Sequence, residues 1–297
     1  MPKISKMKRI GISSKTIIVT ISVIVSFSLL ISFASQENPF QSESFSYDGV
    51  PRAAILDQLH SDIPNVKFQE EATKYLKTAG YEVDLFTTEQ LTVNFFKKLP
   101  KMNYEFIVFR THAVGDDGPN YSEEDPVAIF TGEKYADDKY IQEQLFGQLR
   151  KGAPFMSSEV AVSVDLSGLD STQSGEEFVA ESSWSLVDNS NPYFMIGSKY
   201  VDELMEGSFP NSVLVLGGCS TLSNPSLANS LIDRGASSVV GWDRLVGASR
   251  NDSVMLAFLE NVLIDNMEVE DAVKSVVKKY NLDSDERPTF SYYDQST

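Results

Sequence analysis

Apolar runs of strand length alternate with amphipathic helical segments from Arg52 onward, and this alternation limits the fold more than any other feature. Three runs in the first part of this region are expected to be strands: 52–59 (RAAILDQL), 81–86 (YEVDLF) and 104–111 (YEFIVFRT). The helix between the first two runs has Asn65 at its N-cap and Gly80 just after its last turn. A shorter helix is expected over residues 91–99. This order is typical of a parallel sheet with helices on both faces.

The same order returns in the carboxyl-terminal part of the chain. Two more runs of strand length occur there: 212–218 (SVLVLGG) and 237–242 (SSVVGW). The helix between them is expected to start at Asn224-Pro225 and to end at Gly235. Helical spacing of apolar side chains predicts two final helices, which contain residues 254–263 and 269–280.

The middle of the chain has a weaker pattern. Residues 139–150 are expected to be helical, and residues 151–192, rich in Ser, Gly and acids, are interpreted as a hairpin-and-loop insertion. Residues 51–297 are therefore expected to form one α/β domain, a three-layer αβα structure with a mostly parallel central sheet.

The amino terminus has the pattern of an export or anchor signal. Residues 16–34 carry no charge and follow a basic flank, 1–15; as a helix they would span roughly 28 Å. The basic flank would stay in the cytoplasm, so a membrane anchor would place the rest of the chain outside it. The alternative is a signal peptide cleaved after Ala34, which would give a secreted protein. Residues 35–50 are polar and are interpreted as a linker.

Charge and composition exclude several classes of function. The formal net charge is −17, so phosphate backbones are repelled and a nucleic-acid partner is not expected. One cysteine and two histidines exclude a multi-cysteine or histidine-rich metal centre. The acidic run over residues 116–125 is interpreted as a solvated loop, with a structural calcium site as the alternative. No cofactor is otherwise expected.

Ligands of an open parallel sheet bind beyond the carboxyl ends of its strands. Four such ends are readable in the sequence: Asp57-Gln58, Thr111-His112-Ala113, Gly217-Gly218-Cys219 and Trp242-Asp243. The only cysteine and one of the two histidines are thus 107 residues apart (219 − 112) but both follow strands. If those strands are adjacent, the imidazole can take the thiol proton and the thiolate can attack a carbonyl carbon.

These two motifs resemble those of the caspase-like (clan CD) cysteine peptidases, which include caspases, legumain, gingipains, clostripain, separase and CHAT domains. In that group a histidine follows one sheet strand, and a cysteine follows the next after an apolar run and a small residue. Residues 235–263 are similar to the segment after the CHAT cysteine, with a Gly-Ala strand, a Trp and an amphipathic helix. The resemblance covers about residues 52–280, is closest to CHAT, gingipain and separase domains, and implies a caspase-like fold.

The resemblance also implies hydrolysis of peptide bonds through a thioester. Cys219 would be the nucleophile and His112 the general base and acid. The backbone N–H groups of Ala113, Gly218 and Cys219 are expected to face the oxyanion. Ala113 departs from the group, which usually has glycine after the histidine, and alanine disfavours a positive φ.

The strand ends also contain candidates for a substrate pocket: Asp57, Gln58, Trp242 and Asp243. Two of these residues are acidic, so the pocket is expected to favour Arg or Lys before the scissile bond of a protein or peptide substrate. Asp243 is the first choice because it follows Trp242 much as in separase-like segments.

Other interpretations of the same residues remain open. Cys219 can be a core thiol, and the Gly217-Gly218 pair can serve only close packing. The chain would then be a catalytically inactive recognition or scaffold module of the same fold at the cell surface. A flavodoxin-like small-molecule sensor is a third interpretation, but the first strand is not followed by a glycine-rich phosphate loop.

Overall fold

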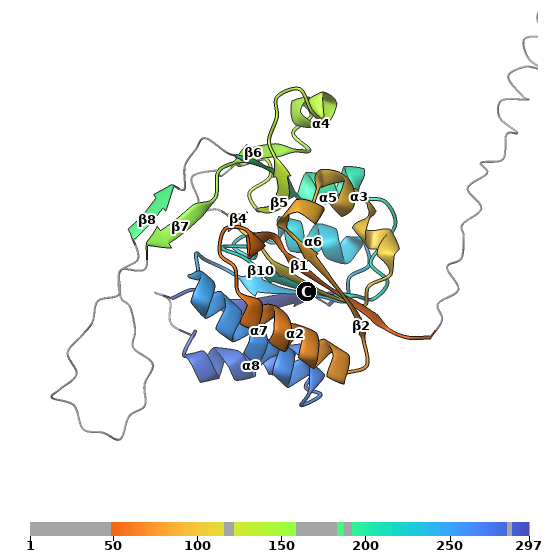
Figure 1. The fold of residues 1–297 in the computed structure, drawn as a ribbon, viewed down its shortest axis with the longest axis vertical. Coiled ribbons are helices and arrows are strands. Elements are labelled where there is room, and N and C mark those ends of the chain that lie inside the picture. The colour runs from red at the N-terminus through yellow and green to blue at the C-terminus, as the bar shows by residue number, and fades with distance from the viewer. Residues whose placement is uncertain (1–48, 116–121, 159–182, 187–191, 284–286, 297) are drawn as a thin grey trace, which may run out of the picture. The chain divides into compact units, whose positions relative to one another are not determined.

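A six-stranded sheet lies at the centre of the protein, and the other elements are arranged around it (Figure 1). The structure is a computed structural model that describes residues 49–115, 122–158, 183–186, 192–283 and 287–296. Residues from Gly49 to Thr297 form one compact unit.

Several sequence predictions fall outside the described residues: the basic flank 1–15, the anchor or signal segment 16–34, most of the linker 35–50, residues 116–121 of the acidic run, and residues 159–182 and 187–191 of the insertion. Within the described ranges, no helix has both the length and the apolar character that a membrane span requires.

The central sheet is mostly parallel, as the sequence predicted. Its order is β12-β11-β10-β3-β1-β2, and only the edge strand β12 runs antiparallel. The strands are β1 (Arg52–Asp57), β2 (Glu82–Thr87), β3 (Phe106–Arg110), β10 (Val213–Gly217), β11 (Ser238–Trp242) and β12 (Phe290–Asp294). The two strands at the middle of this order, β3 and β10, are therefore hydrogen-bonded neighbours although they are far apart in sequence.

Helices cover both faces of the sheet (Figure 1). On one face lie α2 (Val66–Thr78), α7 (Ala248–Leu263) and α8 (Val269–Tyr280); on the other lie α3 (Val93–Lys98), α5 (Ser198–Leu204) and α6 (Ser226–Asp233). Strand side chains alternate between the two cores: Ala53 and Ile55 pack toward α2 and α7, whereas Ala54 and Leu56 pack toward α3 and α6. Burial on both faces explains why the strands are apolar runs without a polar face.

Local signals in the sequence fix the ends of the first long helix. The side chain of Asn65 accepts a hydrogen bond from the backbone N–H of Phe68 at 3.0 Å, which caps α2. Gly80 follows the helix with φ +95°, a conformation that residues with a Cβ rarely adopt. The predicted cap and the predicted stop are both confirmed.

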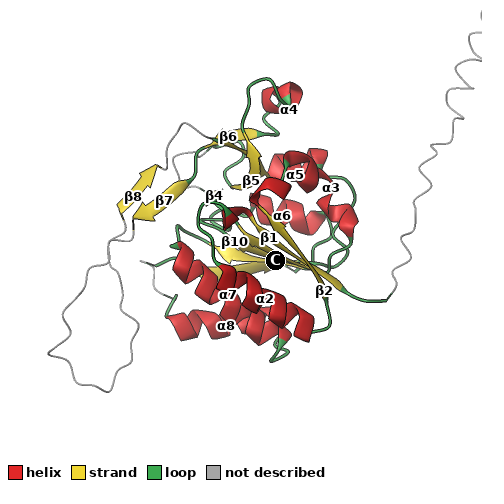
Figure 2. Cartoon of the chain, viewed as in Figure 1, coloured by secondary structure: helices red, strands yellow, loops and turns green. Residues whose placement is uncertain are grey.

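A smaller antiparallel sheet, which the sequence pattern did not predict, extends from the end of β3 (Figure 2). Its order is β4-β5-β9-β6, with bounds β4 (Ala113–Val114), β5 (Ala128–Lys134), β9 (Tyr193–Gly197) and β6 (Arg150–Gly152). Within the predicted insertion, β7 (Phe155–Ser158) pairs antiparallel with β8 (Ser183–Leu186). The first residue of β4 directly follows His112, so the smaller sheet begins at the candidate site.

The prediction of a helix over residues 139–150 is wrong for most of that range. Only α4 (Ile141–Leu145) is an α-helix there, and Gly147 turns the chain with φ +69° before β6 begins. Three large apolar side chains of this range are exposed: Ile141 at 52%, Leu145 at 75% and Phe146 at 61%.

Candidate active site

His112 and Cys219 lie just beyond the carboxyl ends of two neighbouring strands. β3 and β10 pair in parallel with Arg110 opposite Gly217. His112 and Cys219 each follow this pair by two residues, so the register places them at the same level of the sheet edge. A hydrogen bond of 3.0 Å from Thr111 N to Gly217 O continues the pairing past Arg110. The pairing of β3 with β10 thus places the motif around His112 and the motif around Cys219 at the same edge of the sheet, although they are far apart in sequence.

The two side chains also project toward the same face of the sheet. Arg110 bonds to an acid of α7, and a Cβ added at Gly217 would strike a methionine of α7. Two residues further on, the Cys219 sulfur lies 3.4 Å from the carbonyl oxygen of Val246, just before α7. The His112 ring faces the loop that leads into α2. The thiol and the imidazole are therefore on the side that α2 and α7 cover.

The imidazole of His112 is held in a nearly closed environment. The residue is 8% exposed, and its ring meets the Phe130 ring edge-on with 5.9 Å between centroids. Its backbone N–H donates to Oε1 of Gln58 at 2.9 Å. Burial and then the positive charge of Arg110 lower the pKa of the His112 imidazole to about 4. At neutral pH the ring is therefore uncharged and able to accept a proton.

The thiol of Cys219 is partly buried and donates to the carbonyl oxygen of Val246. The residue that follows, Ser220, is fully buried and has φ +54°. A non-glycine residue in this left-handed conformation stores backbone strain, and such strain is common beside reactive groups. The backbone therefore turns sharply directly after Cys219, at Ser220.

Gly217 and Gly218 are required by close packing. A Cβ at Gly217 would lie 1.9 Å from Sδ of Met255, and one at Gly218 would lie 2.7 Å from the carbonyl oxygen of Thr111. The backbone of β10 can approach β3 and α7 only because both side chains are absent. The packing interpretation of the glycine pair accounts for both residues, and it leaves the role of the cysteine unchanged.

The backbone around the site modifies the predicted oxyanion donors. The N–H of Gly218 donates to the carbonyl oxygen of Leu216 at 3.0 Å, so it is not free to bind an oxyanion, and its predicted role is wrong. Ala113 is not among the residues with positive φ, so alanine fits this turn without strain. The N–H groups of Ala113 and Cys219 stay predicted donors.

Asp57 is buried and already paired, so it does not line a substrate pocket as the sequence suggested. Its Oδ1 accepts from Arg110 Nη1 at 2.9 Å, and both side chains are 0% exposed. Arg110 also donates from Nε to Asp252 of α7 at 2.8 Å and from Nη2 to the carbonyl oxygen of Ile63 at 2.9 Å. This buried ion-pair network joins β1, β3 and α7 directly beneath the candidate site.

Gln58 and Trp242, two further predicted pocket residues, are also buried. The Oε1 atom of Gln58 accepts the N–H of His112, and its Nε2 atom is buried with no hydrogen-bond partner. The indole N–H of Trp242 donates to Asn251 of α7 at 2.9 Å. Both residues therefore support the edge of the sheet from inside and present no surface to a substrate.

Asp243 is the acidic strand-end residue that solvent reaches. Its side chain is 33% exposed, and its Oδ1 atom accepts the backbone N–H of Thr289 at 2.6 Å. Its Oδ2 atom lies 3.9 Å from Nε of Arg244, whose side chain is 47% exposed. One oxygen of this carboxylate is therefore held by the backbone, and the other lies beside Arg244 at the protein surface.

Asp62 is a site residue that the sequence interpretation missed. Its Oδ2 atom lies 3.9 Å from Nε2 of His112, and its side chain is 30% exposed. The residue follows β1 by five positions, beyond the short 3₁₀ turn Gln58–His60, so it did not stand out as a strand-end residue. A turn signal in the sequence, Ser61 to Pro64, would have been the available indication.

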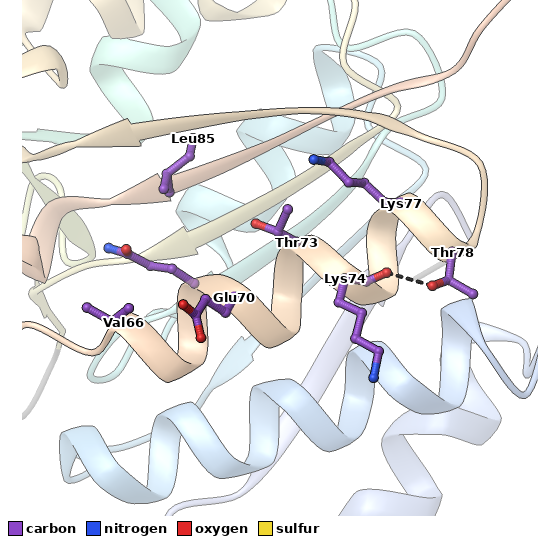
Figure 3. Close-up of a pocket in the computed structure, with 8 residues that line it drawn as sticks. Val66, Glu70, Thr73, Lys74, Lys77, Thr78 and Leu85 are labelled. Atoms are coloured by element: carbon purple, nitrogen blue, oxygen red, sulfur yellow. Dashed lines mark hydrogen bonds between the residues drawn. The ribbon is translucent and has the colours of Figure 1, made fainter.

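Two cavities lie near these elements. One of about 250 Å³ lies beside the buried Arg110 network, between the starts of α2 and α7, and its lining includes Ile63, Phe68, Arg110, Ala248 and Leu256. A groove of about 740 Å³ runs between α2 and the edge strand β2, where Thr73 and Lys77 face Leu85 (Figure 3). The lining of neither cavity includes His112 or Cys219; the smaller one is nearer to the candidate site in the chain, because its lining includes Arg110 and Ile63.

Among the residues that the structure describes, no group of three or more His, Cys, Asp or Glu side chains is placed to hold a metal ion. Residues 116–121 of the acidic run lie outside that part of the chain, so the calcium alternative stays a prediction. Comparison with models of known protein families and with curated proteins finds no match to this chain.

Proposed function

We propose that this chain is a cysteine peptidase with a three-layer caspase-like fold, in which His112 and Cys219 form the catalytic dyad. One observation carries the proposal: β3 and β10 are neighbours in a register that puts the two residues at one level of one sheet edge. This is the arrangement that the resemblance to caspase-like peptidases requires, with the histidine after one strand and the cysteine after the next.

The chemistry follows from the two side chains. The neutral imidazole accepts the proton of the Cys219 thiol as the sulfur attacks the carbonyl carbon of the scissile bond. The N–H groups of Ala113 and Cys219 face the oxyanion, the leaving amine takes the proton back from His112, and a thioester forms. Water activated by the same imidazole then hydrolyses the thioester, which regenerates the thiol.

The substrate is a protein or peptide with Arg or Lys before the scissile bond. Asp243 supports this choice because it is an acidic strand-end residue with an oxygen near solvent. The net charge of −17 adds to it, because a strongly acidic protein attracts basic segments over long range. With residues 16–34 as an anchor or a cleaved signal, the enzyme would act outside the cytoplasm, at the membrane or secreted.

A thiol-reactive peptide probe tests the activity. An acyloxymethyl ketone with Arg at the position before the reactive carbon is expected to label Cys219 in the purified full-length protein, and His112→Ala is expected to abolish the labelling. His60→Ala is the matched control, since His60 contacts Gln69 and is the only other histidine. Labelling that is absent in the wild type, or that persists in His112→Ala, would contradict the proposal.

The pocket assignment has a separate test. Asp243→Asn keeps an acceptor for Thr289 but removes the charge, so it is expected to slow labelling by the Arg probe about tenfold and to leave a Leu probe unaffected. Asp265→Asn, an exposed acid after α7, serves as the control. Equal rates with both probes in wild type and Asp243→Asn would remove Asp243 from the pocket.

One observation favours the alternative of an inactive recognition or scaffold module. The thiol donates a hydrogen bond to Val246 O, and the imidazole is almost closed to solvent. In this alternative the sulfur stays a packing group against the α7 core. The probe experiment separates the two functions, because an inactive module leaves Cys219 unlabelled while its fold, measured by thermal unfolding, is intact.

A further inference from the structure

The imidazole of His112 has one nitrogen that no group satisfies. Its Nε2 atom is buried and, among the described residues, has no hydrogen-bond partner. A buried donor or acceptor without a partner is unfavourable, so such atoms are rare and call for a reason. Nε2 of the adjacent Gln58 is in the same condition, so two unsatisfied nitrogens lie at this one edge of the sheet.

A carboxylate faces the unsatisfied nitrogen. Asp62 Oδ2 is 3.9 Å from His112 Nε2, about 1 Å longer than a charge-assisted hydrogen bond. This distance is typical of catalytic contacts that shorten when substrate binds, because geometry in the free enzyme is often loose. Among the described residues, Arg110 at the end of β3 is the charged group that acts on the pKa of the ring, and Cys219 follows the neighbouring strand β10 by two residues.

The loop that carries Asp62 is held on both sides. The Ser61 backbone N–H donates to Thr88 Oγ1 at 3.1 Å, and its hydroxyl donates to Glu89 Oε1 at 2.9 Å. On the other side, the carbonyl oxygen of Ile63 accepts from Arg110, which precedes His112 by two residues. The same arginine thus ties the loop of Asp62 to the strand of His112, and the fold itself sets the distance between carboxylate and ring.

We infer that Asp62 is a positioning residue that makes the candidate dyad a Cys219–His112–Asp62 triad. This inference rests on the proposed function. Asp62 accepts a hydrogen bond from the Nε2–H group, which fixes the tautomer and leaves Nδ1 to take the thiol proton from Cys219. When the thiolate forms, the positive charge on the imidazolium is balanced by the carboxylate, and no proton moves to Asp62.

Alkylation of the single cysteine by iodoacetamide tests the triad in the purified full-length protein between pH 5 and 9. An opposite charge within 4–6 Å shifts a pKa by about one unit or more, so Asp62→Asn is expected to lower the alkylation rate at pH 7 severalfold, up to about tenfold. The pH midpoint should rise by about one unit in the same variant. Asp62→Glu is expected to restore the rate to within threefold of wild type.

A double variant separates positioning from structure. In the His112→Ala background, Asp62→Asn is expected to have no further effect, because its action passes through the imidazole. The matched control is Glu89→Gln, which removes the charge of a carboxylate that contacts the same loop through Ser61 and should leave the rate unchanged.

The outcomes distinguish this inference from the function on which it rests. If His112→Ala slows alkylation but Asp62→Asn stays within twofold of wild type, the triad is refuted and the dyad stands. An Asp62→Asn effect that persists without His112 also refutes the triad. If neither variant changes the rate and the wild type has the midpoint of a free thiol, near 8.5, the proposed function fails as well.

Discussion

Arg110 is the residue whose loss should most damage the fold beneath the candidate site. Its guanidinium makes four hydrogen bonds: Nη1 to Asp57 at 2.9 Å, Nε and Nη2 to Asp252 at 2.8 and 2.9 Å, and Nη2 to Ile63 O at 2.9 Å. Arg110→Met fills similar space but leaves two buried carboxylates without their cation.

The expected cost follows from the burial of the pair. Removing one partner of a buried ion pair costs about 3–5 kcal/mol, because the remaining charge stays away from water without compensation. The side chain of Asp57 is 0% exposed and that of Asp252 is 6% exposed, so both carboxylates contribute. Urea unfolding of the full-length protein should show a free energy of unfolding lower by at least about 3 kcal/mol in Arg110→Met.

A triple variant checks the reason for the loss. Asp57→Asn and Asp252→Asn, added to Arg110→Met, remove the uncompensated charges and should restore at least half of the lost stability. A loss below about 1 kcal/mol in Arg110→Met would refute the electrostatic argument, since that is the range of exposed pairs. A triple variant no more stable than Arg110→Met would show that packing, and not charge, accounts for the cost.

Two further predictions concern the same region. The pKa of His112 is lowered to about 4 from an ordinary 6.5. Below pH 6.5 the unfolded chain therefore binds a proton at this residue while the folded chain does not, and the free energy of unfolding falls. Between pH 6.5 and 4 the wild type should lose about 3 kcal/mol more stability than His112→Gln in urea unfolding, and matching pH profiles would contradict this. Gly217→Ala should lower stability by about 1–3 kcal/mol, because its Cβ would meet Met255 Sδ at 1.9 Å and Phe109 O at 2.7 Å. Adding Met255→Ala should return only part of that loss, as the Phe109 carbonyl remains; full recovery would show that the backbone contact is harmless.

The sequence predicted the elements whose signals are local. The α2 cap at Asn65 and the stop at Gly80 depend on neighbours within a few residues, and both are confirmed. The helical range 269–280 is confirmed as α8, because its apolar spacing repeats over three turns. The parallel order of the sheet follows from helices that alternate with apolar runs.

Features that depend on distant partners were not predictable. β4 and β6 contain only two and three residues, which is too few for a pattern that would distinguish them from loops. The helix expected over residues 139–150 is limited to α4, because its apolar side chains are exposed and do not pack against the core, and Gly147 ends the turn.

For the candidate site, the sequence identified His112 and Cys219 from their places after apolar runs, and the register of β3 and β10 puts both residues at the same level of one sheet edge. Asp57 was misinterpreted as a pocket residue because a carboxylate at a strand end looks the same whether or not an arginine lies opposite. Its partner, Arg110, is 53 residues away in the chain and is brought to it by the pairing of β1 with β3. Asp62 was missed for the same reason, since only the folded loop points it at the imidazole.

The pairing of β3 with β10 has a consequence for cleavage of the chain itself. The proposed base belongs to the amino-terminal portion of the chain and the proposed nucleophile to the carboxyl-terminal portion. The strands that precede them, β3 and β10, are nevertheless paired by backbone hydrogen bonds. A nick in the polypeptide between residues 115 and 212 would leave two fragments that still share a single sheet, with both reactive groups in register. A truncated chain that ends before residue 213 would contain His112 but not Cys219. The proposed reaction would therefore require β10 and the residues that follow it.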